Sequence, residues 1–142
     1  MDEVKLNDGN LAEIARLRSR WIMTEASKIM EAKECTRSYA VISAWRTWRL
    51  LDAMASGKVF FWYQKKNGDS RCAIGTLAKG ADQAFDQYLE LHDNEVRAPR
   101  KETPCNFVYW DCDKRGFRTF RSYELLPDQH QFNLNGLIDE EE

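Results

Sequence analysis

The chain has 142 residues, of which 21 are basic and 23 acidic, so its formal net charge is −2. This length suits one domain with a modest core, and an apolar content of 43% is typical of a globular protein rather than a disordered or fibrous one. No stretch reaches the about 18 apolar residues of a membrane span, and the first residues lack the apolar segment of a secretory signal. Composition therefore predicts a cytoplasmic protein.

The small net charge hides an uneven distribution. Without its segment Ala81–Glu95, the region Trp45–Arg121 holds 14 basic and five acidic residues and carries a net charge of +9. The excluded segment has five acidic residues and no lysine or arginine, and the chain ends in four acidic residues, Asp139–Glu142. We interpret both acidic parts as solvated and separable from the body. A basic body predicts an anionic partner.

Two helices are expected first. Apolar residues recur at spacings close to three and four over Asn10–Lys33, which predicts a helix whose exposed face leaves room for a homodimer. Thr36 or Ser38 is expected to cap a second helix that ends at Gly57, because glycine readily adopts the positive φ found at many helix ends. In this helix, Trp45 and Trp48 share one face, and we expect them to pack onto the part of the chain that follows the helix.

A β-hairpin is expected next. The runs Lys58–Gln64 and Ser70–Leu77 are rich in β-branched and aromatic residues. Between them stands Asn67-Gly68, a pair that predicts a tight type I′ turn, because both residues tolerate positive φ. Gly75, inside the second run, indicates a bulge or a sharp bend of the kind that curls a small sheet toward closure.

A second hairpin is expected from Asn106–Cys112 and Phe117–Ser122, with a turn at Asp113–Gly116. A single helical turn, Tyr123–Leu126, follows it. Between the two hairpins lies an acidic insertion at 81–104, for which we expect a short surface helix followed by a loop from His92 to Pro104.

These elements predict an α+β fold, with two N-terminal helices packed on a small, strongly curved barrel built from the two hairpins. We expect an N-terminal helix at 1–35, a helix plus barrel at 36–126, and a polar, acidic, flexible tail at 127–142. Because about 60 residues of sheet enclose only a small core, the second helix must cover an open end or face of the barrel.

Several segments resemble the SH3 β-barrel-fold proteins related to WYL domains, which are small proteins of gut Bacteroidota, their phages and mobile elements. The similarity covers roughly residues 36–126, and its most specific piece is the hairpin strand Gly116-Phe-Arg-Thr-Phe-Arg121. The resemblance implies an SH3-like barrel and a binding role in ligand sensing or nucleic-acid contact. The other segments that carry it are Arg37-Ser-Tyr-Ala40, Ala44-Trp45-Arg46, Val59–Tyr63, Asn67-Gly68, Gly75-Thr-Leu77 and Phe107–Asp111.

The candidate binding site combines cations with aromatic rings. Alternation along the returning strand puts Arg118 and Phe120 on one side and Phe117 and Arg121 on the other. An arginine beside a ring can hold a phosphate while the ring stacks on a base. An alternative is that the rings are simply core and the arginines lie at its rim. The candidate ligand-binding residues are Arg118, Arg121, Lys65, Lys66, Arg71, Trp62, Tyr109 and Arg115.

No catalytic or metal site is indicated, and we expect no cofactor. The only close carboxylate pair, Asp111 and Asp113, suits turn geometry better than acid–base work or a Mg²⁺ site, because the sequence places no third ligand beside it. The four cysteines and two histidines lack zinc spacing, and the thiols are expected to be structural or idle.

We therefore expect a non-enzymatic module that binds nucleic acid or a nucleotide through its basic, aromatic hairpins. The alternative is a phage or mobile-element factor that binds a host protein through the acidic insertion and tail and inhibits a defence or nucleic-acid enzyme. A third hypothesis joins the two: a pocket that sequesters a cyclic oligonucleotide signal.

Overall fold

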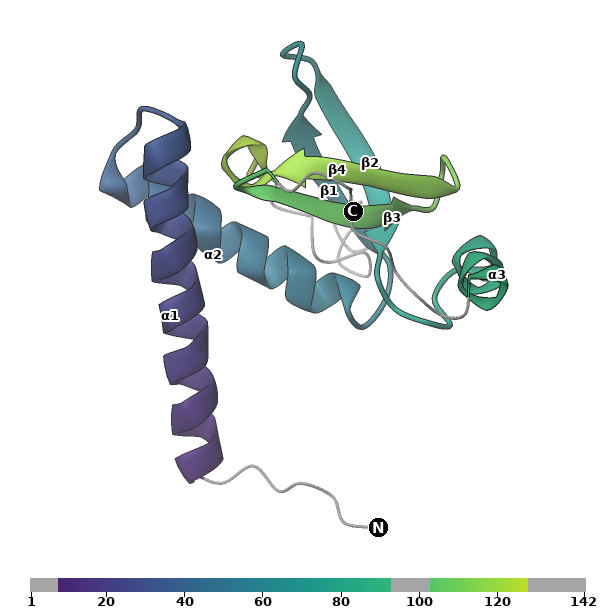
Figure 1. Ribbon diagram of the computed structural model, residues 1–142, viewed down its shortest axis with the longest axis horizontal. Coiled ribbons are helices and arrows are strands. Elements are labelled where there is room, and N and C mark those ends of the chain that lie inside the picture. The colour runs from purple at the N-terminus through teal and green to yellow at the C-terminus, as the bar shows by residue number, and fades with distance from the viewer. Residues whose placement is uncertain (1–7, 93–102, 128–142) are drawn as a thin grey trace, which may run out of the picture.

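Two helices precede a four-stranded sheet in the computed structural model, which describes residues 8–92 and 103–127 (Figure 1). Helix α1 spans Asp8–Ala32 and helix α2 spans Arg37–Met54, close to the predicted ranges. The predicted tail, and most of the predicted loop between His92 and Pro104, lie outside the described residues. In the described part of the chain, no helix is both long enough and apolar enough to span a membrane.

Helix α2 begins at a polar cap. The side-chain oxygen of Thr36 accepts a hydrogen bond of 3.1 Å from the backbone N–H of Tyr39, so Thr36 rather than Ser38 is the cap. The helix ends three residues before Gly57, with Ala55 in an ordinary right-handed conformation. Gly57 has no positive φ, so the prediction that it ends the helix in this way is wrong.

The strands form one antiparallel sheet in chain order: β1 (Val59–Gln64), β2 (Ser70–Thr76), β3 (Asn106–Asp111) and β4 (Gly116–Arg121). Within each hairpin the strands pair along their whole length. Between the hairpins only two residue pairs connect β2 to β3, Gly75 with Asp111 and Thr76 with Trp110. The two hairpins therefore meet at a corner, and the sheet curls (Figure 1).

The turn between β1 and β2 differs from the prediction. Lys65 N–H donates to Asp69 O at 2.8 Å, and Gly68 N–H donates to Lys65 O at 2.9 Å. Gly68 has a φ of 94°, whereas Asn67 has no positive φ. This is a three-residue loop closed by a left-handed glycine, so the predicted type I′ turn is wrong although the hairpin itself is confirmed.

Gly75 lies at the corner where β2 leaves β1 for β3. Its pairing with Val59 continues an unbroken register to the hairpin end, so it marks a bend and not a bulge. A Cβ atom built on Gly75 would lie 2.6 Å from a ring carbon of Tyr109 and 3.0 Å from one of Phe61. Glycine is therefore required here because two core rings pack directly against its backbone.

The barrel closes after β4. A 3₁₀ helix, Ser122–Glu124, turns the chain so that Leu125 forms a bridge with Tyr63 of β1. Leu126 N–H then donates to Trp62 O at 2.9 Å. The core inside the barrel is rich in aromatic rings and is covered by α2, as predicted. Its buried members are Leu50, Met54, Val59, Phe61, Tyr63, Ala73, Tyr109, Phe120 and Leu125.

Helix α1 packs across α2 through its C-terminal half, where Ile22, Ala26 and Ile29 are buried. The buried carboxylate of Glu25 accepts a hydrogen bond of 2.7 Å from Ser122 Oγ, which ties α1 to the barrel. These contacts confirm the predicted α+β arrangement of two N-terminal helices packed on a small barrel.

The acidic segment is not a separable attachment. Its helix α3 (Gln83–Leu91) packs on the outer face of β3 and β4 through Phe85 and Leu89, which are buried against Trp110 and Phe117. The predicted short helix is therefore confirmed. The description of this segment as a solvated attachment is wrong, because α3 buries Phe85 and Leu89 on the barrel.

Candidate ligand-binding site

One end of the barrel's inner face carries polar side chains, which we call the barrel mouth: Tyr63, Arg71, Tyr109, Asp111 and Arg118. Tyr63 stands opposite Arg71 in the first hairpin, and Tyr109 stands opposite Arg118 in the second. Directly opposed residues of an antiparallel pair share a face. The burial of both tyrosines identifies that face as the inner one.

A hydrogen-bond network holds the barrel mouth together. The hydroxyls of Tyr63 and Tyr109 lie 2.9 Å apart, and that of Tyr109 also donates to Asp111 at 3.3 Å. Asp111 is fully buried and forms an ion pair with the guanidinium of Arg71. The first hairpin therefore contributes a tyrosine and an arginine to a network centred on the second.

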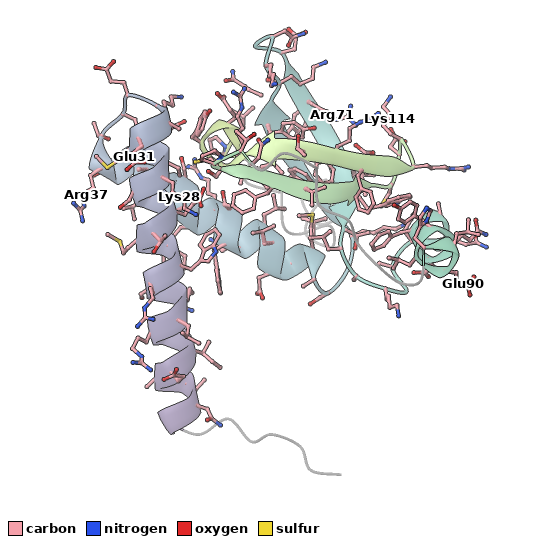
Figure 2. The ribbon with its side chains drawn as sticks, viewed as in Figure 1. Lys28, Glu31, Arg37, Arg71, Glu90 and Lys114 are labelled. Atoms are coloured by element: carbon pink, nitrogen blue, oxygen red, sulfur yellow. The ribbon has the colours of Figure 1, made fainter. Side chains whose placement is uncertain are left out.

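Asp111 also fixes the loop between β3 and β4. Its second carboxylate oxygen accepts backbone hydrogen bonds from Asp113 at 3.0 Å and from Lys114 at 2.9 Å. Figure 2 shows Arg71 and Lys114 at the same end of the barrel, as their shared partner requires. The loop carries Arg115 with a φ of 56°, a strained backbone for a residue other than glycine.

The network holds its members in fixed charge states. Burial alone raises the pKa of Asp111, but the backbone hydrogen bond from Lys114 and the pairing with Arg71 outweigh this effect and hold the pKa below its usual value. The pKa of Tyr109 is raised, first by burial and then by its hydrogen bond with Tyr63. At neutral pH the network therefore contains an anionic carboxylate at Asp111, paired with Arg71, and a neutral hydroxyl at Tyr109.

Arg118 is the exposed cation of the barrel mouth. It lies beside Tyr109 on the inner face, and it forms no ion pair with any residue in the described ranges. The expectation that Arg118 shares a face with a buried Phe120 is confirmed. Lys65 and Lys66 are exposed in the loop that joins β1 to β2. This loop lies next to the paired residues Tyr63 and Arg71.

Three of the predicted site residues do not offer their side chains to a ligand at the barrel mouth. Tyr109 is fully buried, so its ring is not offered to a ligand, contrary to the prediction. Trp62 is 38% exposed but lies on the outer face of β1, because its neighbours Phe61 and Tyr63 point inward. Arg121 is on the opposite face of β4 from Arg118, with its guanidinium 5.4 Å from the ring of Tyr123.

Arg115 lines a groove of about 510 Å³ between the β3–β4 loop and α3. Here Lys58 forms an ion pair of 3.6 Å with Asp82, which also caps α3 and accepts a hydrogen bond from the indole of Trp110. Burial, followed by the charge of Asp82, raises the pKa of the Cys112 thiol to about 11. The groove therefore contains a neutral thiol and no activated nucleophile.

Sequence reasoning missed two features of the site. It considered Asp111 only as a turn residue, an acid–base group or a metal ligand, and it did not assign Tyr63 to the site. The hairpin register, which puts Tyr63 opposite Arg71, is a signal that could have found Tyr63. Both carboxylate oxygens of Asp111 already accept hydrogen bonds, and the described residues contain no cluster of three His, Cys, Asp or Glu side chains that could hold a metal.

Fold and site together define a small, SH3-like barrel with a polar, arginine-bearing mouth and a helical cover. A family model, WYL_2, described as an Sm-like SH3 beta-barrel fold, matches residues 47–126, and the chain belongs to this family. The resemblance to WYL-related SH3 barrels is thereby confirmed. Searches of curated proteins and of solved structures give no match.

Proposed function

We propose that the protein is a non-enzymatic module whose barrel mouth binds an anionic ligand, either single-stranded nucleic acid or a nucleotide. The observation that carries this proposal is the position of Arg118, an exposed guanidinium without an ion-pair partner among the described residues. It lies next to a network that fixes a second guanidinium, that of Arg71. An exposed guanidinium suits a phosphate, because it can donate two parallel hydrogen bonds to the phosphate oxygens.

Arg71 is suited to position a ligand rather than to attract it. About a fifth of its side chain is exposed, and its Nε is buried without a hydrogen-bond partner in the described part of the chain. Its ion pair with Asp111 neutralises much of its charge but fixes its direction. The attraction over longer distances then comes from the exposed lysines of the loops, Lys65, Lys66 and Lys114.

A nucleic-acid strand would find a stacking surface on the same hairpin. Trp62 is 38% exposed and stands three residues before Lys65, at the start of the loop. A strand that passes over the loop from the barrel mouth would contact the lysines and reach this ring on the outer face. Stacking of a base on an exposed tryptophan contributes about 1 to 3 kcal/mol without sequence preference.

The chemistry of the barrel mouth favours binding over catalysis. A general base needs a pKa near the working pH, whereas the pKa of Asp111 is held low and that of Tyr109 is raised. Neither group is therefore suited to exchange protons with a substrate at neutral pH. This supports the non-enzymatic part of the proposal.

The alternative, a protein-interaction factor acting through its acidic segment, gains no support from the described acids of that segment. Asp82 caps α3 and pairs with Lys58, while Asp86 accepts a hydrogen bond from the backbone of Gly80. Both carboxylates therefore stabilise the fold. Sequestration of a cyclic oligonucleotide remains a special case of the proposed anion binding.

The test is a fluorescence-anisotropy titration with labelled single-stranded RNA and DNA of about ten nucleotides, with mononucleotides and cyclic oligonucleotides as competitors. We expect Arg118→Ala to weaken binding about tenfold or more, because a hydrogen bond to a charged group contributes about 1.5 to 3 kcal/mol. Arg37→Ala is the matched control, since Arg37 is an exposed arginine far from Arg71 (Figure 2). Absence of binding at low salt, or equal losses in the two variants, would refute the proposal.

A further inference from the structure

Half of helix α1 projects from the molecule (Figure 1), and apolar side chains on this half are exposed. Leu11, Ile14 and Leu17 are 50%, 46% and 49% exposed, whereas Ile22 and Ile29 in the other half are almost fully buried. An isolated helical segment as short as residues 10–17 is barely stable in water, even when its residues favour helix. The projecting half, in which the exposed apolar side chains lie within residues 10–17, therefore has the features of a helix that is covered by a partner.

The uncovered side chains continue a face that is already an interface. Eleven residues make about three turns of an α-helix, so Leu11 lies in line with Ile22. The buried Ile22 contacts α2 within the same chain. The face that α1 uses to pack on α2 thus extends into its projecting half, with Arg18 lying between Ile22 and Leu11.

A groove beside the projecting half is lined by tryptophans, and we call it the tryptophan groove. It consists of two adjoining hollows of about 430 and 230 Å³ between α1 and α2. Trp45 is 39% exposed beside Arg18, and Trp48 contacts Trp21 at a ring separation of 5.5 Å, so both rings contact the preceding helix and not only the part of the chain that follows, as was expected. The main lining residues are Arg18, Trp21, Trp45, Trp48, Arg49 and Asp52.

The groove also contains an unsatisfied polar atom. The guanidinium of Arg18 lies 5.2 Å from the centre of the Trp45 ring, and its Nε is shielded from solvent without a hydrogen-bond partner in the described ranges. Buried donors are normally paired, and an incoming acceptor would satisfy this one. Tryptophan and arginine are also the residues that most often dominate the energy of protein interfaces.

We propose that the projecting half of α1 from a second copy of this chain occupies the tryptophan groove, and that the two copies do so reciprocally. Helix and groove adjoin each other on one chain, since Arg18 follows Leu17 directly, so a two-fold axis near this point can place each helix over the other groove. Both surfaces carry charges of both signs: the projecting half has Glu13 paired with Arg16, and the groove has Arg18 and Arg49 beside Asp52, so opposite charges can face each other across the contact.

The first test measures the molar mass of the full chain by light scattering after size-exclusion chromatography, over a range of concentrations. We expect a dimer for the wild type and a monomer for Ile14→Asp and for Trp45→Ala. Met23→Asp is the matched control, because Met23 is 41% exposed on the same helix but faces about 180° away from Ile14, and this variant should remain a dimer. Circular dichroism checks that each variant keeps its helices, and Leu17→Asp repeats the test at a neighbouring exposed position.

The second test examines reciprocity. Ile14→Asp retains the groove and Trp45→Ala retains the helix, so mixing the two monomeric variants should restore one of the two contacts and give a heterodimer. A simple pairing of α1 with α1 would not be restored in this way. The proposal is overturned if the wild type is a monomer throughout, if Met23→Asp dissociates as readily as Ile14→Asp, or if the mixture stays monomeric. Binding of nucleic acid at the barrel mouth does not depend on any of these outcomes.

Discussion

Replacement of the buried carboxylate, Asp111→Asn, tests the network at the barrel mouth most severely. The substitution preserves the size of the side chain but removes the charge that Arg71 faces and turns an amide N–H₂ toward a hydrogen-bond donor. The carboxylate is fully buried and accepts hydrogen bonds from two backbone N–H groups, from Arg71 and from Tyr109.

The expected cost follows from these contacts. Breaking a buried ion pair by removing one partner destabilises a protein by about 3 to 5 kcal/mol. Arg71 keeps about a fifth of its side chain in solvent and can recover some hydration, so the low end applies. We expect the free energy of unfolding to fall by about 3 kcal/mol, which for a chain of this size lowers the melting temperature by about 6 to 12 °C.

Urea denaturation followed by tryptophan fluorescence measures this change, and its pH dependence adds a second readout. The pKa of Asp111 is lowered in the folded state, so its contribution is complete above the unfolded value near 3.9 and is lost as the pH falls through the folded value. The wild type should therefore lose stability as the pH falls below about 4, and Asp111→Asn should lose less over the same range.

The control is Asp113→Asn, which neutralises an exposed aspartate in the same loop. We expect it to change the free energy of unfolding by less than about 0.5 kcal/mol. If Asp111→Asn costs no more than this control, or if both variants show the acid dependence of the wild type, the network does not stabilise the barrel mouth as argued here.

Three further predictions concern the packing around the site. Gly75→Ala should destabilise the fold by about 2 kcal/mol in thermal denaturation, because a Cβ would lie 2.6 Å from a core ring carbon, whereas Gly57→Ala, with nothing within 4 Å, should have little effect. Phe85→Ala should cost about 4 kcal/mol and increase hydrogen exchange in α3; unchanged exchange would show that the helix is not anchored by this ring. Burial, followed by the charge of a nearby glutamate, raises the pKa of the Cys105 thiol to about 11, so iodoacetamide at neutral pH should label the exposed Cys72 first; equal rates would contradict the buried placement of Cys105.

The sequence was informative wherever a local pattern decides the structure. Thr36 caps α2 through a contact three residues away, and the hairpins follow from alternating runs on either side of a glycine-bearing turn. The exact turn was less predictable, since Asn67-Gly68 suits more than one loop type and the pairing of Lys65 with Asp69 decided between them.

Contacts between distant parts of the chain could not be predicted from the sequence. The ion pair between Arg71 and Asp111 joins residues 40 positions apart, and no rule of sequence spacing predicts it. The acidic composition of the α3 segment indicated a solvated surface, but Phe85 and Leu89 determine how the helix packs. Alternation placed Arg118 and Arg121 on opposite sides of one strand, but only the burial of Phe120 shows which side faces the barrel interior.

The central claim is that the barrel mouth binds an anion through Arg118, and the most direct measurement is the salt dependence of binding to a labelled single strand. The logarithm of the affinity should fall linearly with the logarithm of the salt concentration, and the slope should become shallower by about 0.7 in Arg118→Ala. Arg37→Ala should keep the wild-type slope. A salt-independent affinity, or identical slopes in all three proteins, would contradict the proposed role of Arg118.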